Sequence, residues 1–343
     1  MHLQPPPRDF VTADALSYVA PAPRHLALLS IVVAFYNEEQ STAAFFDAIA
    51  KVVSGLPCKT ELVCVNDGST DRTLDRLREE MFLNPRIRVI NLARNFGKEA
   101  AITAGMAHAK GDAVVLIDAD LQDPPSTIPS FIAKWHEGFD MVYGVRACRD
   151  TDSFLKRWTA RHFYRLFNVL TDVYIPPDVA DFRLLDRRVV DALLSMPERN
   201  RFMKGMFAWV GFKQTSVAYT RATRSAGVSG WTYLRLLNLA IDGFTSFSVT
   251  PLRLATLAGL LVSIFGFAYA AFLVWRTILF GIDVPGYASV MVAILFLGGV
   301  QLACLGILGE YLGRLYIEAK ARPLYLIADV FSGEQDDDQG GGD

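Results

Sequence analysis

The chain has 343 residues, of which 52% are hydrophobic, and its 34 Lys and Arg against 36 Asp and Glu give a net charge of -2. This length allows one large domain or two ordinary ones, and the charge balance excludes the global basic field that draws a protein to nucleic acid. The four cysteines have no Cys-x-x-Cys spacing and lie among apolar neighbours, which argues against a zinc site or a disulfide framework.

The amino-terminal segment is rich in proline and lacks an apolar stretch preceded by positive charge. A secretory signal peptide is therefore not expected. We expect residues 1–25 to form a disordered extension and the domain that follows to stay in the cytoplasm.

Apolar runs that fit buried strands alternate with segments of helical spacing over the next hundred residues. The expected strands are 28–34, 61–65, 87–92 and 113–117, and the expected helices are 41–53, 73–81 and 100–109. Such alternation predicts an α/β fold with a doubly wound, mostly parallel sheet. Ser69 or Thr70 is expected to cap the second helix, and strand-like runs return at 180–185 and 213–221.

Two acids, Asp118 and Asp120, directly follow the strand expected at 113–117. The carboxyl edge of an open α/β sheet is where ligands bind, and Asp-x-Asp there offers hard oxygen ligands to Mg²⁺ or Mn²⁺, which in turn hold a substrate's phosphates. A solvated acidic loop is the simpler alternative.

Two earlier turns carry polar groups to the same edge, Asn37-Glu38 and Asn66-Asp67. Each has a structural alternative, because Asp67 can serve as a helix cap and Asn37-Glu38 can be a hydrophilic turn. Together with the Asp-x-Asp pair they converge where a nucleotide would lie. Gly-x-Gly-x-x-Gly after the first strand and Gly-x-x-x-x-Gly-Lys-Ser/Thr are both missing from the sequence, which argues against Rossmann oxidoreductases and P-loop enzymes.

Basic residues, including Arg157 and Arg161, interleave with aromatic residues over 153–170. This mixture suits an amphipathic helix at a membrane interface, and a surface helix packed on the sheet is the alternative. The carboxyl third decides between them, because 254–275 and 284–309 contain no charged residue and are each long enough to cross roughly 30 Å of hydrocarbon.

These patterns predict five segments after the extension. They are a cytoplasmic catalytic domain at 26–228, an interfacial amphipathic helix at 229–250, membrane helices at 251–280 and 284–312, and a cytoplasmic tail at 313–343 with a disordered acidic end from 334. A buried core hairpin is the alternative to the membrane helices. Arg253 before the uncharged run 254–275 and Arg314 after the second run place both ends in the cytoplasm, although Arg276 lies on the outer side.

Several motifs in fixed order resemble the inverting polyprenyl-phosphate glycosyltransferases of family 2, such as dolichol-phosphate mannose synthase and the bacterial undecaprenyl-phosphate glucosyl and aminoarabinosyl transferases. The motifs are Asn37-Glu38, Val65-Asn66-Asp67-Gly68-Ser69, Arg94-Asn95-Phe96-Gly97-Lys98, Asp118-Ala119-Asp120-Leu121-Gln122-Asp123-Pro124-Pro125, Asp181-Phe182-Arg183-Leu184 and Gly309-Glu310-Tyr311-Leu312-Gly313-Arg314. The resemblance spans about residues 28–327 and implies a GT-A fold.

The resemblance also implies roles for individual residues. Asp181 and Asp120 are expected to be catalytic, and Mg²⁺ or Mn²⁺ is expected on Asp118, Asp120 and Gln122. The nucleotide sugar is expected at Phe35, Asn37, Glu38, Asp67, Arg94, Lys98 and Asp118, and the acceptor phosphate at Arg157, Arg161, Arg183 and Arg224. The family's Glu-Ser-Lys is replaced here by Val228-Ser229-Gly230, so Arg224 or Arg235 is expected to substitute for its lysine.

The expected reaction is inverting transfer of a monosaccharide from a nucleotide sugar, preferably a UDP-sugar, to undecaprenyl phosphate. The resemblance further implies a homo-oligomer in the inner (plasma) membrane. Whether Asp181 acts as a base or only orients the acceptor stays open, as does the sugar. Two alternatives remain: a processive polysaccharide synthase, which would show Gln-x-x-Arg-Trp and more spans, and a catalytically silent membrane scaffold or sugar-lipid carrier.

Overall fold

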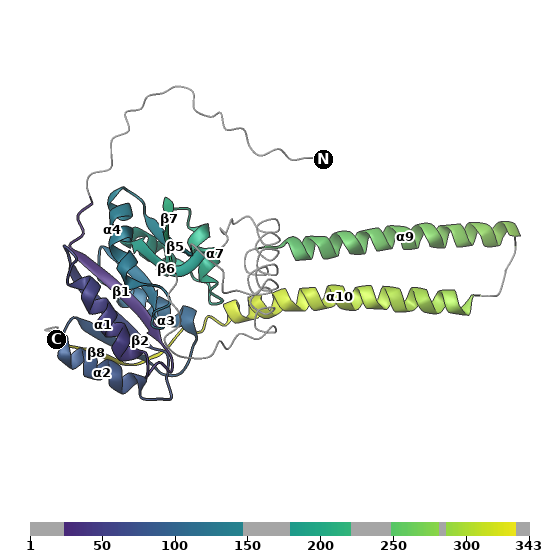
Figure 1. The fold of residues 1–343 in the computed structure, drawn as a ribbon. Coiled ribbons are helices and arrows are strands. Elements are labelled where there is room, and N and C mark those ends of the chain that lie inside the picture. Colours follow the sequence, from purple (N-terminus) through teal and green to yellow (C-terminus); the bar gives the residue numbers. More distant parts are fainter. Residues whose placement is uncertain (1–23, 147–178, 221–247, 281–285, 334–343) are drawn as a thin grey trace, which may run out of the picture.

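The computed structural model describes residues 24–146, 179–220, 248–280 and 286–333 (Figure 1). Four expected features lie outside these residues: most of the amino-terminal extension, the basic and aromatic segment 153–170, most of the interfacial helix and the acidic end. Arg157, Arg161, Arg224 and the segment Val228-Ser229-Gly230 lie outside them as well.

An eight-stranded sheet in the order β7-β5-β6-β4-β1-β2-β3-β8 organises the part of the chain that the structure describes. Its strands are β1 (Leu28–Phe35), β2 (Lys59–Asn66), β3 (Ile87–Leu92), β4 (Ala113–Asp118), β5 (Met141–Arg146), β6 (Val179–Asp186), β7 (Gln214–Tyr219) and β8 (Ile327–Ser332). The pairs β1–β2, β1–β4, β2–β3 and β5–β7 are parallel, whereas β6 and β8 run antiparallel to their neighbours. The mostly parallel, doubly wound sheet is therefore confirmed.

Helices cover both faces of this sheet. They are α1 (Thr42–Val53), α2 (Thr73–Leu83), α3 (Lys98–His108), a 3-10 turn at Pro125–Thr127, α4 (Ile128–His136), α6 (Arg187–Ser195) and α7 (Met203–Trp209). Alternate residues of each strand point to opposite faces, so Ile31 and Val33 pack under α1, α2 and α4, while Val32 packs under α3, α6 and α7. This double burial explains why the strands are continuous apolar runs.

The alanine-rich α3 packs closely on the sheet at Gly105. A Cβ atom at Gly105 would stand 2.3 Å from Cγ1 of Val32, so only glycine fits this approach. Small residues on α3 therefore bring its first turn close to the strand ends, where the polar turns gather.

The expected cap of α2 is wrong in detail. Ser69 Oγ accepts a hydrogen bond from Asn37 N at 3.0 Å, and Thr70 N donates to Asn37 Oδ1 at 2.8 Å. Asp71 supplies the helix-end contact instead, since its Oδ1 accepts from Thr73 N at 3.0 Å. Ser69 and Thr70 thus tie the turn after β2 to the turn after β1.

Two long apolar helices leave the sheet domain side by side, α9 (Thr250–Phe280) and α10 (Tyr287–Ala319) (Figure 1). Within them, Leu252–Phe280 and Val292–Ala319 are long and apolar enough to cross a membrane. Their large side chains are exposed, among them Phe267 at 78%. Exposed apolar surface on this scale indicates a membrane or another apolar partner.

Within the tail expected at 313–343, α10 continues to Ala319 and β8 then joins the sheet, while the cytoplasmic location of this segment stays a prediction. β8 pairs with β3, and Ala93 N donates to Leu326 O at 2.9 Å just beyond the pairing. Glu318 Oε1 also accepts from the backbone N of Arg199 at 2.8 Å. The chain after α10 therefore holds the sheet domain against the base of the apolar helices.

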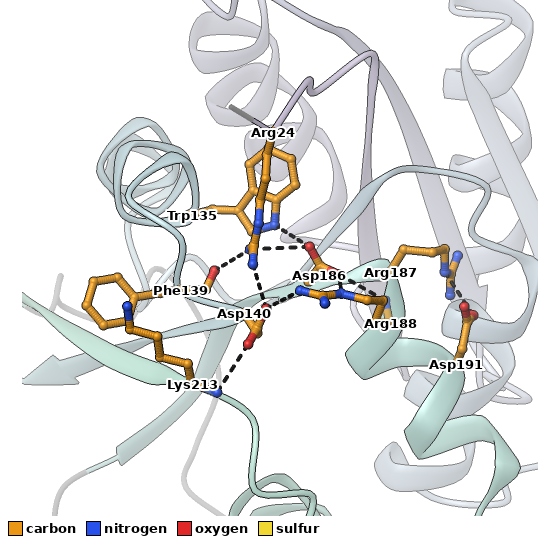
Figure 2. Close-up of polar contacts among 9 residues, drawn as sticks. All are labelled: Arg24, Trp135, Phe139, Asp140, Asp186, Arg187, Arg188, Asp191 and Lys213. Atoms are coloured by element: carbon orange, nitrogen blue, oxygen red, sulfur yellow. Dashed lines mark hydrogen bonds and ion pairs between the residues drawn. The ribbon is translucent and has the colours of Figure 1, made fainter. Parts of the chain in front are cut away.

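A network of charged residues lies at the edge of the sheet where β4 begins, opposite the edge where β4 ends (Figure 2). Arg24 Nη2 lies 2.7 Å from Asp140 Oδ1, and Trp135 Nε1 donates to Asp186 Oδ2 at 2.9 Å. Asp186 also pairs with Arg188, and it stands beside the first residue of β4. Because each of these groups has a partner and the cluster lies away from Asp118, we interpret it as structural.

Replacing Asp186 with Ala should lower the free energy of unfolding by about 2–4 kcal/mol, because the indole N–H of Trp135 and the guanidinium of Arg24 lose their shared carboxylate. Chemical denaturation of the detergent-solubilised protein measures the change. Asp191→Ala is the control, since Asp191 is 63% exposed and, among the residues that the structure describes, forms an ion pair only with Arg187 on the same helix. This change should cost about 0.5 kcal/mol or less. Equal losses in both variants would contradict the structural role.

Candidate active site

A pocket opens where the strands end on the carboxyl side of the sheet. Its lining comes from the turns after β1, β2 and β4 and from the start of α3: Ala34, Phe35, Tyr36, Glu38, Asp67, Asn95, Gly97, Lys98, Asp118, Ala119 and Asp120. Polar turns that are far apart in the sequence therefore meet at one edge, as expected for an α/β ligand site.

Lys98, the first residue of α3, joins two carboxylates in this region. Its Nζ lies 2.7 Å from Asp118 Oδ1 and 2.9 Å from Asp181 Oδ2. Although burial disfavours the charged lysine, the two carboxylates raise the pKa of Lys98. Burial also disfavours the ionised Asp181, but Lys98 and Lys204 outweigh it and hold the pKa of Asp181 well below its usual range. Lys98 and Asp181 are therefore both charged near neutral pH.

Asp67 fixes the loop that carries Lys98. Its Oδ1 accepts from Phe96 N at 2.7 Å and its Oδ2 accepts from Gly97 N at 3.0 Å. Burial raises the pKa of this carboxyl above its ordinary value, in spite of the two amide hydrogen bonds. Gly97 has φ +97°, a conformation that favours glycine. Asp67 thus sets the place where α3 begins while also lining the pocket.

The donor set fits a divalent cation that arrives with a phosphorylated ligand. Asp118 and Asp120 line the pocket, and Gln122, buried at 8% exposure, donates its backbone N to Asp120 Oδ1 at 3.2 Å. Within residues 24–146, 179–220, 248–280 and 286–333, no group of three or more Asp, Glu, His or Cys could hold a metal ion. Mg²⁺ is often bound by one or two carboxylates together with substrate phosphates, so these carboxylates fit a divalent metal ion.

The remaining expected donor-site residues lie around the pocket in different ways. Asn37 braces the neighbouring turn through Thr70, and Phe35 packs its ring against Phe45 at a centroid distance of 5.6 Å. The guanidinium of Arg94 lies over the ring of Phe96, with Cζ 4.2 Å from the ring centroid. Their contacts to a nucleotide sugar stay predictions.

Arg183 lies in the core and is only 2% exposed. Its Nη2 donates to Ala180 O at 2.9 Å, and its Cζ lies 3.7 Å from the ring centroid of Phe207. Burial lowers the pKa of Arg183 to about 10, in spite of the nearby Asp181. Arg183 therefore packs in the core next to Asp181, and its expected contact with the acceptor phosphate stays a prediction.

Two contacts escape sequence reasoning. Tyr219 of β7 donates its hydroxyl to Asp123 Oδ1, and Lys204 of α7 lies 3.8 Å from Asp181. The cation-rich run around Lys204 marks that residue as basic, but nothing in the sequence pairs it with Asp181 or pairs Tyr219 with Asp123, because β6 and β7 come together through strand pairing with β5 over long separations.

Comparisons with known proteins agree with this architecture. Residues 30–194 match Glycosyl transferase family 2, and residues 250–315 match the GtrB C-terminal hairpin. The second match covers most of α9 and α10, so the apolar hairpin is a feature that this chain shares with a known group of proteins.

Full-length relatives extend the likeness over nearly the whole chain. The uncharacterized glycosyltransferase sll0501 of Synechocystis sp. is 51% identical over 88% of this chain and 95% of its own length. The bactoprenol glucosyl transferase of Shigella phage SfV is 47% identical over 87% and 97%. The prophage bactoprenol glucosyl transferase homolog of Escherichia coli K12 is 46% identical over 88% and 99%. The expected family and GT-A fold are thereby confirmed: the chain belongs to glycosyltransferase family 2 and is a glycosyltransferase with a GtrB-type C-terminal hairpin.

Proposed function

We propose that the chain transfers glucose from UDP-glucose to undecaprenyl phosphate, with inversion at the anomeric carbon. The observation that carries the proposal is a pocket with Asp118 and Asp120 at the sheet edge of a domain joined to two apolar helices. Relatives named bactoprenol glucosyl transferase support glucose as the sugar and a polyprenyl carrier as the acceptor. UDP is preferred as the nucleotide from the family resemblance.

The reaction is a single displacement. An oxygen of the acceptor phosphate forms a bond to the anomeric carbon, while the bond from that carbon to the diphosphate oxygen breaks and its electron pair leaves with UDP. A phosphate monoester has a second pKa near 6 and is already anionic at neutral pH. The acceptor therefore needs no general base, and the ion-paired Asp181 acts by orienting groups at the reacting centre.

Residues at the start of α3 suit the departing diphosphate. Lys98 supplies an ammonium, and a helix N-terminus favours anions. Asp118 and Asp120 would hold Mg²⁺ or Mn²⁺, which when bound supplies neutralisation of the charge that develops on the leaving group.

The layout also matches the location of the two substrates. A nucleotide sugar is soluble and a polyprenyl phosphate is confined to the bilayer, so the pocket must stand close to the membrane surface. We place the sheet domain and both chain ends on the cytoplasmic side of the inner membrane, as the charges around the spans favour. A homo-oligomer packed through α9 and α10 stays a prediction, as do Arg157, Arg161 and Arg224 as contacts for the lipid phosphate.

Radiolabelled sugar transfer tests the proposal. Purified protein, undecaprenyl phosphate and Mn²⁺ should move label from UDP-glucose into the organic phase, faster than from GDP-mannose or UDP-N-acetylglucosamine. A chelator should abolish the transfer, because the metal offsets charge on departing UDP. Absence of organic-phase label with every donor would overturn the proposed reaction, and equal transfer with chelator would overturn its metal dependence.

Asp120→Asn should lower kcat by about 10²–10³, the usual loss when one transition-state stabilising group is removed, and leave the circular dichroism spectrum unchanged. Asp75→Asn is the matched control, since Asp75 lies on α2, is 58% exposed and pairs only loosely with Arg72. Its turnover should equal that of the wild type. Unchanged turnover of Asp120→Asn would remove the proposed metal role.

A further inference from the structure

Lys204 lies on α7, on the side of the sheet domain from which α9 and α10 extend (Figure 1). The end of α10 fixes the segment directly before α7, because Glu318 Oε1 accepts from the backbone N of Arg199 and of Asn200 at 2.8 and 3.1 Å. Trp209, the last residue of α7, is 62% exposed. An exposed Trp beside a membrane hairpin suits the interface between water and lipid. α7 therefore faces the bilayer side of the site.

Two lysines reach Asp181 from different directions. Lys98 of α3 contacts Oδ2 at 2.9 Å, and Lys204 of α7 approaches Oδ1 to 3.8 Å. Lys98 also binds Asp118 and so belongs to the donor pocket. Lys204 belongs to the helix that follows the segment bound by Glu318 of α10, so the carboxylate of Asp181 stands between a donor-side cation and a membrane-side cation.

Lys98 and Lys204 differ in how many of their N–H groups are already engaged in hydrogen bonds. An ammonium offers three donors, and Lys98 uses its own in contacts of 2.7 to 2.9 Å with two carboxylates. The distance from Lys204 to Asp181 is too long for a hydrogen bond, and the described part of the chain offers this ammonium no hydrogen-bond partner. Its side chain is 30% exposed. Lys204 can therefore receive an additional anion without breaking an existing hydrogen bond.

A cation is needed at this point. The acceptor phosphate must reach the anomeric carbon beside Asp181, and like charges repel there. Glu99 adds a further carboxylate that Lys204 partly offsets. A lysine placed between the acceptor phosphate and these carboxylates offsets the repulsion between them. It can also form charge-assisted hydrogen bonds to the phosphate, which are strong.

We infer that Lys204 binds the phosphate of the lipid acceptor on the membrane side of Asp181. The inference rests on the proposed function, in which the acceptor is a polyprenyl phosphate. Lys98 and Lys204 then divide the two anions between them, with the donor diphosphate at Lys98 and the acceptor phosphate at Lys204.

Steady-state kinetics of Lys204→Ala and Lys204→Arg test this assignment. Lys204→Ala should raise the KM for undecaprenyl phosphate about tenfold or more and leave the KM for UDP-glucose within about twofold, since only an acceptor contact is lost. Lys204→Arg keeps the charge and should restore most of the acceptor affinity. Lys134→Ala is the control, because Lys134 is 39% exposed on α4 and pairs with Glu137, and should match the wild type.

Native mass spectrometry of undecaprenyl phosphate adducts separates this inference from the proposed function, because it needs no turnover. Weaker lipid binding by Lys204→Ala supports the inference even if no sugar is transferred, in which case the proposed reaction alone fails. Unchanged lipid binding overturns the inference, as does a fall in kcat with both KM values unchanged, which would mean that Lys204 acts only on Asp181. Binding to phosphatidylglycerol vesicles controls for a general membrane contact. The wild type and Lys204→Ala should sediment equally with these vesicles, and weaker sedimentation of Lys204→Ala would assign Lys204 to general membrane binding instead.

Discussion

The bridge from Lys98 to Asp118 and Asp181 is the interaction on which the site depends. It joins the end of a parallel strand to a strand that runs the opposite way, through the first residue of a helix. Two carboxylates this close repel, so the lysine is needed to hold them together in the free protein. Asp67 serves the bridge indirectly, since it fixes the loop from which Lys98 extends.

The second constraint is the different location of the two substrates. A water-soluble donor and a bilayer-bound acceptor can react only if the pocket is held at a fixed place beside the membrane. The chain meets this requirement by returning after α10: Glu318 contacts the segment before α7, and β8 extends the sheet beside the loop of Arg94. Both sides of the reacting centre are thus tied to the base of the same apolar hairpin.

Sequence periodicity predicted the first four strands, the three helices between them and the two apolar spans, because each forms a local pattern of apolar residues. It missed β5, β8, α4, α6 and α7, which depend on strand pairing over long separations or are too short to show a period. The polar turns were placed correctly at one edge because parallel strands share their carboxyl ends. The contact between Lys204 and Asp181 could not be predicted, since β6 and α7 carry no shared pattern.

The central claim is that Asp118, which is paired to Lys98, and Asp120 hold a metal ion in the pocket only together with a nucleoside diphosphate. Electron paramagnetic resonance of Mn²⁺ tests this claim most directly, because the free ion gives a signal that is lost on binding. The account predicts little loss of signal when the protein is added alone and a saturable loss when UDP is added with it. Equally tight Mn²⁺ binding without UDP, and its persistence in Asp120→Asn, would contradict the account.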